Sequence, residues 1–455
     1  MPDDLKKLMG RKILSEANDL KRTIKALAEE IDVSEQKLNE IVKGHCAWEE
    51  ISDVVERMGR RYPIDPAELH FIEDDCTNGI RIMRAEESRA SRRIFDRKDK
   101  NGQRTPYYEY RDTVMSKLGP FKPEWIKELR YVEDSDPNNP DVAYNNGHFL
   151  HQMTFFIGPV NFYWEVRGKK YCAKMDTGDS NYITPFWPHS FTSRDKKETA
   201  LILAVTFGGD VKRAQKELYG LGMHAIKNYI LDMSDYHRAE LQLIKQHMSN
   251  ENLTLWHLKE ILKKRSLRMD IDKIFEGKQE IDDEGLRHLA DCLNLELGDL
   301  LLSKAAKGEE VLVKHKSEDE AYLYPDRATP PYKVNPLVRC PRMSQMKGFD
   351  MEILLHRLDG LPDLVSSYHS YIYNYGDTAL KFQWRKEDQL FEELLHPGDS
   401  LYLQPFIEHS FANKDEERGK ILVVRVSGAV NFSTQKELSY FANIDRIIES
   451  KCWFD

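Results

Sequence analysis

The sequence lacks the features that mark membrane proteins, disulfide scaffolds and cysteine-built metal sites. Its longest apolar runs are short, as at residues 201–205, so no segment is expected to span a bilayer. The six cysteines are scattered singly without a C-x-x-C pair, which indicates a reducing cytoplasm and excludes a zinc site made of cysteines. No apolar stretch follows the charged start, so we expect no secretory signal.

Positive charge is also in deficit. The formal net charge is −9 over 455 residues, a balance that does not favour binding to nucleic acid or to an anionic membrane. Apolar residues make up 40% of the chain and charged residues 31%, which indicates a folded protein rather than a disordered one. At roughly 100–200 residues per domain, we expect about two to four domains.

The sequence contains an internal repeat. The segment GDSNYITPFWPHSF at residues 178–191 matches GDSLYLQPFIEHSF at residues 398–411 without gaps, at an offset of 220 residues. Both segments lead into a charged turn and an apolar strand, and Trp164 and Trp384 share the same offset. The repeat predicts a tandem duplication of a module as long as that offset.

Each module has a helical front part and a β-rich back part. Residues 24–31 and 34–42 carry apolar side chains at helical spacing, and Ser34 is a good N-cap, so they predict a helix-turn-helix. The back part has many short strands rich in aromatic and β-branched residues, typical of a barrel or a double-sheet jelly roll. The predicted α+β fold has helical parts at 1–75 and 236–305 and β parts at 76–235 and 306–455.

The helix-turn-helix pattern makes DNA binding one hypothesis. Residues 1–62 hold 12 Lys and Arg against 13 Asp and Glu, so they offer no basic face that neutralises phosphates. We therefore expect the helical parts to serve packing or oligomerisation, with no nucleic acid as partner.

A candidate metal site lies in the first β part. The pattern Gly-Asp-x-x-Tyr-x-x-Pro-x-x-x-His, present in both copies, is similar to the second motif of the cupin family, whose barrel interior holds a metal. Along one strand, alternation puts His148 and Gln152 on the same face and His151 on the other. His148, Gln152 and His189 form a candidate set of three ligands, and Glu165 is a competing carboxylate. The alternative is that these histidines are structural and hydrogen-bonded.

The second β part serves as an internal control for this site. Ser366 and Ser370 stand where the first part has His148 and Gln152, whereas His409 matches the remaining histidine. We therefore expect one metal per chain, in the first part, and a degenerate second barrel without metal. A basic segment at 81–104 holds nine Lys and Arg against four acids, which indicates an anionic substrate or, alternatively, a solvated helix face.

The combination of features resembles one enzyme family. A duplicated helix-turn-helix plus cupin, with Asn-Asn-Gly-His at 145–148 and Pro-His-Ser at 188–190, is similar to the methylphosphonate synthase and 2-hydroxyethylphosphonate dioxygenase family of mononuclear non-haem iron enzymes. The resemblance covers nearly the whole chain and is most specific over residues 88–207. It implies Fe(II) as cofactor, with a small phosphonate and O2 as substrates.

Residue roles follow from the resemblance. It implies that His148 and His189 bind the iron and that Arg97, Tyr110 and Asn145 bind the substrate.

The resemblance also covers a catalytic lysine and includes two departures. Lys21 matches a catalytic lysine that reaches the active site from the helical part. Ile183 stands where the dioxygenase has a glutamate ligand, so the resemblance implies Gln152 as its replacement, which is the pattern of the synthase. Ala204 stands where the dioxygenase has a serine near the substrate.

The implied reaction is an Fe(II)- and O2-dependent carbon–carbon bond cleavage, from 2-hydroxyethylphosphonate to methylphosphonate and carbon dioxide. The alternative within the family is the dioxygenase reaction, which gives hydroxymethylphosphonate and formate. A cupin transcription regulator is a different class, and a sugar-phosphate isomerase would need more His and Glu ligands. We expect a cytoplasmic homo-oligomer that binds no membrane.

Overall fold

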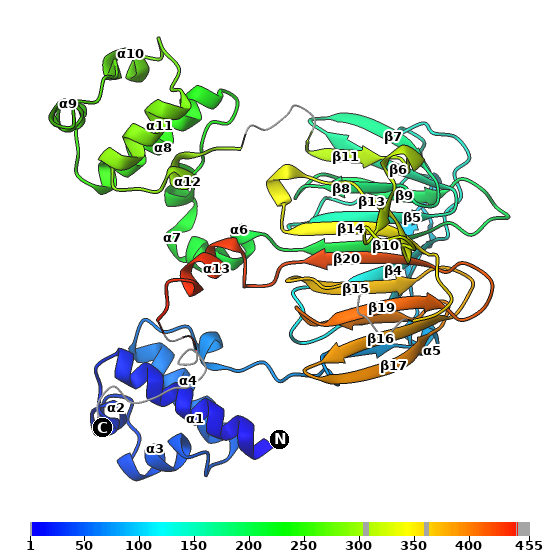
Figure 1. Cartoon of the computed structure of the whole chain (residues 1–455), viewed down its shortest axis with the longest axis horizontal. Coiled ribbons are helices and arrows are strands. Elements are labelled where there is room, and N and C mark those ends of the chain that lie inside the picture. The colour runs from blue at the N-terminus through cyan, green and yellow to red at the C-terminus, as the bar shows by residue number, and fades with distance from the viewer. Residues whose placement is uncertain (1, 304–308, 359–363, 443, 445–455) are drawn as a thin grey trace.

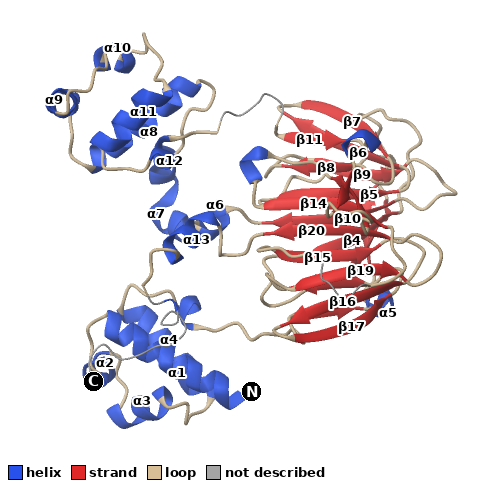
Figure 2. Ribbon diagram, viewed as in Figure 1, coloured by secondary structure: helices blue, strands red, loops and turns tan. Residues whose placement is uncertain are grey.

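The computed structural model describes residues 2–303, 309–358, 364–442 and 444. Strands form a stack of sheets on one side of the molecule, and helices gather in separate groups on the other (Figure 1 and Figure 2). This mixture of helices and sheets is the broad class that the sequence predicts. No described helix is long and apolar enough to cross a membrane.

The first helical group has its own apolar core, which includes Ile13, Leu38 and Met58. Thr23 and Ser34 cap two of its helices, because each hydroxyl accepts the backbone N–H three residues ahead. The predicted cap at Ser34 is thus confirmed. The group consists of α1 (Pro2–Asp19), α2 (Ile24–Glu30), α3 (Glu35–Val42), α4 (Trp48–Arg61) and the 3-10 helix η1 (Pro66–Leu69).

A second helical group has a separate apolar core. It consists of α8 (Tyr236–Asn250), α9 (Leu255–Lys264), α10 (Ile271–Phe275), α11 (Asp283–Cys292) and α12 (Leu297–Leu300). The remaining helices connect or flank the sheets: α5 (Ala85–Ala90), α6 (Asp210–Arg213), α7 (Gln215–Asn228), η2 (Glu318–Glu320), η3 (Pro341–Met343) and α13 (Phe432–Leu438).

The strands of the first half form one large and one small antiparallel sheet. Across the large sheet the order is β11 (Val311–Lys314), β8 (Ser180–Ile183), β5 (His151–Ile157), β10 (Leu201–Phe207), β4 (Pro123–Glu128), β3 (Arg104–Asp112) and β2 (Arg93–Lys98). The small sheet has the order β7 (Lys169–Met175), β6 (Val160–Val166) and β9 (His189–Ser193). The two sheets share one apolar core, so we call the pair the first sandwich.

The second half repeats this arrangement. Its large sheet has the order β1 (Ile80–Met83), β18 (Ser400–Leu403), β15 (His369–Asn374), β20 (Lys420–Val426), β14 (Met346–Ile353), β13 (Tyr332–Pro336) and β12 (Tyr322–Tyr324). Its small sheet has the order β17 (Gln389–Leu395), β16 (Leu380–Lys386) and β19 (Glu408–Asn413). These sheets also share one core and form the second sandwich.

The two large sheets exchange an edge strand. β1 comes from the first half of the chain but pairs with β18, with Ile80 opposite Leu403. β11 comes from the second half but pairs with β8, with Val311 opposite Ile183. The four-part division of the chain stays a prediction, and the strand pairing adds that each half completes the other half's sheet.

The outer faces of the two large sheets pack against each other. The core between them includes Phe155 and Leu203 from the first sheet and Tyr371 and Val424 from the second. Alternation along β5 decides which side chains reach this core. Phe155 therefore faces the second sheet, whereas Phe156 faces the interior of the first sandwich.

We expect Phe155→Ala to lower the free energy of unfolding by about 3–5 kcal/mol, because the fully buried ring leaves a cavity between the large sheets. Guanidinium denaturation followed by tryptophan fluorescence measures the change. Phe432→Ala is the matched control, since Phe432 is 78% exposed and its truncation should change stability by less than about 0.5 kcal/mol. Equal effects of the two substitutions would contradict this role of the inter-sheet core.

Candidate metal and substrate site

A cavity of about 150 Å³ lies inside the first sandwich. Side chains from several strands and from the loop before β5 converge on it. The described lining includes the six residues predicted for metal and substrate binding: His148, Gln152, His189, Arg97, Tyr110 and Asn145. Residues that lie far apart in the sequence are thus brought together at one place.

His148 and Gln152 present two lone pairs to each other. The ring N–H of His148 at Nδ1 donates to the carbonyl oxygen of Leu150 at 2.7 Å, which leaves the lone pair on Nε2. The amide nitrogen of Gln152 donates to the hydroxyl of Thr154 at 2.9 Å, which turns the amide oxygen toward His148. His148 Nε2 and Gln152 Oε1 are 3.0 Å apart. Either a proton on Nε2 or a cation beside both atoms satisfies this pair, so the arrangement is compatible with a metal ion.

His189 completes this ligand set. Its Nδ1–H donates to the carbonyl oxygen of Trp187 at 2.9 Å, so Nε2 carries the lone pair. Nε2 accepts an N–H of Asn145 at 2.9 Å, a hydrogen bond that a metal at this nitrogen would replace. The rings of His148 and His189 are perpendicular, with centroids 5.1 Å apart. Burial, with a smaller contribution from His148, lowers the pKa of His189 to about 4. The imidazole is therefore neutral at physiological pH and available as a ligand.

The strand register places Gln152 beside position 183. Ile183 in β8 lies directly opposite Gln152 in β5, and such cross-strand neighbours point to the same face. An amide from position 152 therefore enters the space that a longer side chain at position 183 would enter. The amide of Gln152 in β5 occupies this space, and Ile183 in β8 contributes to the apolar core beside it.

The two competing ligands point elsewhere. Trp164 lies opposite His189 and shares its face, so Glu165, the next residue in β6, points away from the cavity. His151 lies on the other face of β5, where the hydroxyl of Tyr182 donates to its Nδ1 at 2.7 Å. His151 lines a different cavity of about 780 Å³.

Arg97 is the basic residue of the segment at 81–104 that lines the cavity. Arg84, Arg92 and Arg93 are bound by acidic side chains of the chain itself. Within the described part of the chain, Arg97 has no carboxylate partner. Burial, with smaller contributions from nearby acids, raises the pKa of Tyr110 to about 12, so its hydroxyl keeps its proton. Arg97 and Tyr110 thus offer a positive charge and a donor to an anion.

Thr154 supports the site from behind Gln152, and Ala204 lines the cavity itself. Thr154 was missed, although it follows Gln152 by two residues on the same strand face, and alternation could have indicated it. Ala204, which was predicted near the substrate, does line the cavity and lies opposite Thr154.

Lys21 does not reach this cavity within one chain. It lies in the turn between α1 and α2, with a positive φ of 59°, and its ammonium group donates to the carbonyl oxygen of Asp19 at 3.1 Å. The first helical group stands apart from the first sandwich (Figure 1). A catalytic role for Lys21 remains a prediction, and it requires a second chain.

The corresponding place in the second sandwich is different. The register puts Ser370 opposite Arg425, as Gln152 is opposite Thr206. His409 is buried, and no described group bonds to its Nε2. A single ring nitrogen without the other two ligands does not make a metal site, so one metal per chain stays the prediction.

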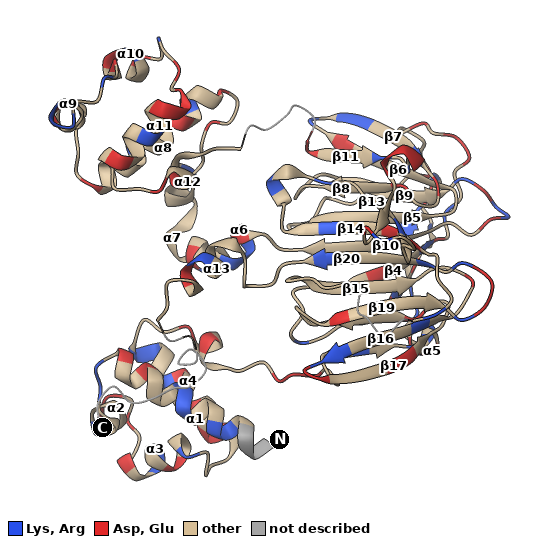
Figure 3. Ribbon diagram, viewed as in Figure 1, with Lys and Arg blue, Asp and Glu red and all other residues tan. Residues whose placement is uncertain are grey.

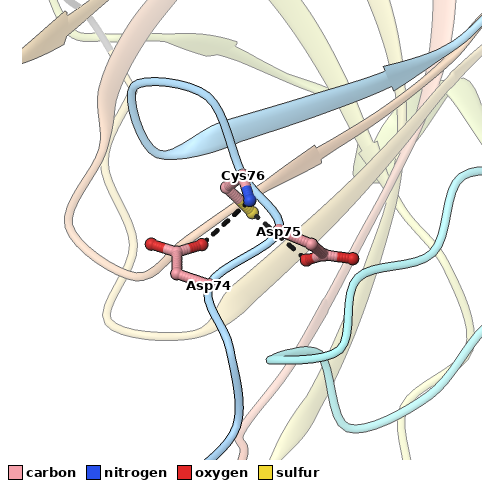
Figure 4. A group of neighbouring side chains, drawn as sticks. All are labelled: Asp74, Asp75 and Cys76. Carbon is pink, nitrogen blue, oxygen red and sulfur yellow. Dashed lines mark hydrogen bonds between the residues drawn. The ribbon is translucent and has the colours of Figure 1, made fainter. Parts of the chain in front are cut away.

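A further group of candidate ligands lies outside the sandwich interiors. Figure 4 shows Asp74, Asp75 and Cys76 side by side in the segment before β1. The carboxylate of Asp75 already binds Arg81 and accepts a hydrogen bond from Ser116 at 2.6 Å. Its negative charge is therefore balanced within the chain, and the group fastens this segment to the sheets.

Comparisons with known proteins show which family the chain belongs to. No protein-family model matches the chain. Methylphosphonate synthase of Nitrosopumilus maritimus (strain SCM1) is 37% identical over an alignment of 465 positions, which covers 100% of this chain and 97% of that protein. The chain belongs to the methylphosphonate synthase family. The predicted family membership and the prediction that the chain is an enzyme are therefore confirmed.

Solved structures of related proteins match the whole chain. Streptomyces albus 2-hydroxyethylphosphonate dioxygenase, with 2-hydroxyethylphosphonate and Fe(II) bound, has a TM-score of 0.88 at 31% identity and covers 99% of both chains. PhpD with cadmium atoms has a TM-score of 0.70 at 18% identity and shares the fold. Members of the methylphosphonate synthase family thus share one architecture with the dioxygenase.

We expect Thr154→Val to weaken binding of a divalent metal about 10- to 100-fold, because the Gln152 amide loses the acceptor that orients it. Titration with Mn(II) followed by electron paramagnetic resonance measures the affinity without turnover. Thr192→Val is the matched control, since Thr192 is buried on the outer face of β9. Wild-type affinity in the Thr154 variant would show that this hydroxyl does not orient the ligand.

Proposed function

We propose that this protein catalyses the Fe(II)- and O2-dependent conversion of 2-hydroxyethylphosphonate to methylphosphonate and carbon dioxide. His148, Gln152 and His189 would hold the iron inside the first sandwich, which we propose to be a cupin barrel. The convergence of His148, Gln152 and His189 on one cavity carries this proposal. The full-length similarity to methylphosphonate synthase supports it. The second sandwich would be a cupin barrel without metal, and the two helical groups a duplicated helix-turn-helix.

The protein's contribution to the reaction is orientation and charge balance. Bound Fe(II) would supply the activation of dioxygen, and the substrate itself would supply the electrons. Arg97 would neutralise the phosphonate, and Tyr110 and Asn145 would donate hydrogen bonds to it. These groups would hold the phosphonate end in place, so that the substrate's one carbon–carbon bond lies beside the residues that would hold the iron.

The amide ligand is the reason to prefer the synthase over the dioxygenase. Gln152 is neutral, so a metal held with His148 and His189 receives no negative charge from its protein ligands. Ala204 likewise brings no hydroxyl to the cavity. The dioxygenase reaction, which yields hydroxymethylphosphonate and formate, remains the second candidate because of the similarity to the Streptomyces albus structure.

Product analysis distinguishes these two reactions. The protein is loaded with Fe(II) without oxygen, mixed with 2-hydroxyethylphosphonate and oxygen, and the products are identified by phosphorus nuclear magnetic resonance. Methylphosphonate supports the proposal, and hydroxymethylphosphonate supports the dioxygenase. Unchanged substrate in fully iron-loaded protein would contradict both.

We also propose that the protein is a cytoplasmic homo-oligomer. Helix α7 has no buried residue in the single chain, and Tyr219, Met223 and Tyr229 are each more than half exposed. A second chain that covers this apolar face could also bring Lys21 to the cavity. Acidic and basic side chains are interspersed on both helical groups (Figure 3), which supports packing rather than DNA binding.

We expect Arg97→Ala to raise KM for 2-hydroxyethylphosphonate roughly 10- to 100-fold, because a charge-assisted contact contributes about 1.5–3 kcal/mol. Initial rates over a range of substrate concentrations measure it. Arg104→Ala is the matched control, since Arg104 lies on the neighbouring strand and donates to the backbone oxygen of Asp96. An unchanged KM for Arg97→Ala would show that the phosphonate binds elsewhere.

We expect Lys21→Ala to lower turnover or alter the product while the protein stays folded, as judged by circular dichroism. Chains that are kept monomeric should already turn over slowly, so Lys21→Ala should lower their turnover no further. If Lys21→Ala has the kinetics and the product of the unaltered protein, Lys21 has no part in the reaction and the helical group is purely structural.

A further inference from the structure

Glu128 is a buried acid that the fold itself does not need. It is the last residue of β4 and is 4% exposed. No described group bonds to either carboxyl oxygen. Burial raises the pKa of Glu128 well above its usual range, so the side chain is a neutral carboxylic acid at physiological pH. A polar group left in this state is destabilising unless it serves another purpose.

The position of Glu128 connects it to the cavity wall. Glu124 and Ile126 on the same face of β4 both line the cavity. The register puts Tyr108 directly opposite Glu128, and Tyr110 opposite Ile126. Glu128 and Tyr110 are therefore diagonal neighbours on one sheet face, a separation that a long side chain spans.

The titratable and charged groups around Glu128 come from neighbouring elements. Tyr107, Tyr108 and Tyr110 of β3 are all near enough to Glu128 for its ionisation to raise their pKa values, and Arg130 lies over the ring of Tyr107 at 4.8 Å. The hydroxyl of Tyr108 is already engaged, since it accepts the N–H of Phe191 at 3.0 Å.

Tyr110 stands out among the tyrosines near Glu128. No described group bonds to its hydroxyl, and it lines the cavity. Glu128 and Tyr110 are thus two neighbouring polar groups that lack partners within the described chain.

The second sandwich shows what the fold accepts at this position. Tyr332 is the counterpart of Tyr108, because its hydroxyl accepts the N–H of Phe411 at 3.0 Å. The residue opposite Tyr332 is Ile353, which is fully buried. The second sandwich, which has no predicted metal site, therefore has an aliphatic side chain at this position. The first sandwich has a carboxyl group there, beside the cavity.

We propose that Glu128 is a positioning residue of the first sandwich, which donates its acid O–H to the hydroxyl oxygen of Tyr110 when an anion occupies the cavity. The hydroxyl proton of Tyr110 is then directed to the phosphonate. No proton changes owner in this arrangement, so Glu128 stays neutral throughout. The proposal rests on the proposed function, since it deepens how that site recognises a phosphonate.

Three variants test this role. Glu128→Ile removes the donor and supplies the side chain of the second sandwich. It should raise the thermal midpoint of unfolding, yet raise KM about 5- to 12-fold with little change in kcat, because the hydrogen bond that directs the Tyr110 hydroxyl to the anion is lost. Glu128→Gln keeps a neutral donor and should restore substrate affinity. In a Tyr110→Phe background, Glu128→Ile should have no further effect on KM.

Two readouts are independent of turnover, so they separate this proposal from the proposed function. Methylphosphonate binding to the metal-loaded protein, measured by calorimetry, should weaken in Glu128→Ile and recover in Glu128→Gln. Between pH 5 and 8, the unaltered protein should lose free energy of unfolding relative to Glu128→Gln as the pH rises, because the carboxyl ionises only in the unfolded chain. If the unaltered protein shows no turnover but both readouts are as expected, the proposed reaction is wrong and the role of Glu128 stands.

Ile353→Gln is the matched control, since it places an amide at the equivalent position of the second sandwich. It should lower the thermal midpoint and leave methylphosphonate binding unchanged. If Glu128→Ile lowers the midpoint, or binds methylphosphonate as tightly as the unaltered protein, Glu128 is a structural residue and the proposal is wrong. An additive effect of Glu128→Ile and Tyr110→Phe on KM would also overturn it.

Discussion

The alternation of side chains along β5 is the constraint on which the rest of the site depends. One face of the strand carries Gln152 and Thr154 into the first sandwich, and the other carries Met153 and Phe155 into the core between the large sheets. A shift of one residue would put the ligand into an apolar interface and a phenylalanine into the cavity. The packing of the two sandwiches against each other therefore also fixes the face on which Gln152 lies, the one proposed metal ligand in β5.

The duplication allows the fold and the chemistry to be separated within one molecule. Equivalent positions in the two sandwiches have the same backbone surroundings, so a difference in side chain reflects a difference in task. Gln152 corresponds to Ser370 and Glu128 to Ile353, and in both cases the polar or longer group lies beside the cavity. By contrast, Tyr108 and Tyr332 make the same hydrogen bond, which identifies that contact as part of the architecture.

Much of the site could be predicted from sequence because it depends on local rules. Period-two alternation put Gln152 on the inner face of β5, and the repeat located His189 beside a turn that both halves share. The expected strand does not extend to His148, which lies in the loop before β5, so its approach to Gln152 comes from the loop and not from alternation. The exchange of β1 and β11 could not be predicted, since edge pairing between distant segments leaves no periodic signal in either strand. The distance of Lys21 from the cavity also depends on how the helical group is placed, which short sequence motifs do not encode. Arg97 was identified by family resemblance, and its lack of a carboxylate partner became visible only in three dimensions.

The strand exchange has a consequence for how the protein is made. During synthesis, β8 emerges from the ribosome long before its edge partner β11, because the second helical group lies between them in the sequence. The first large sheet must therefore remain open at that edge while the next domain is translated, and its unpaired backbone groups are exposed in the meantime. Neither half contains every strand of its own large sheet, so a fragment that encodes a single half would leave one sheet edge unpaired. The pairing of β8 with β11, four residues from each strand, thus links the two halves of the chain in one sheet.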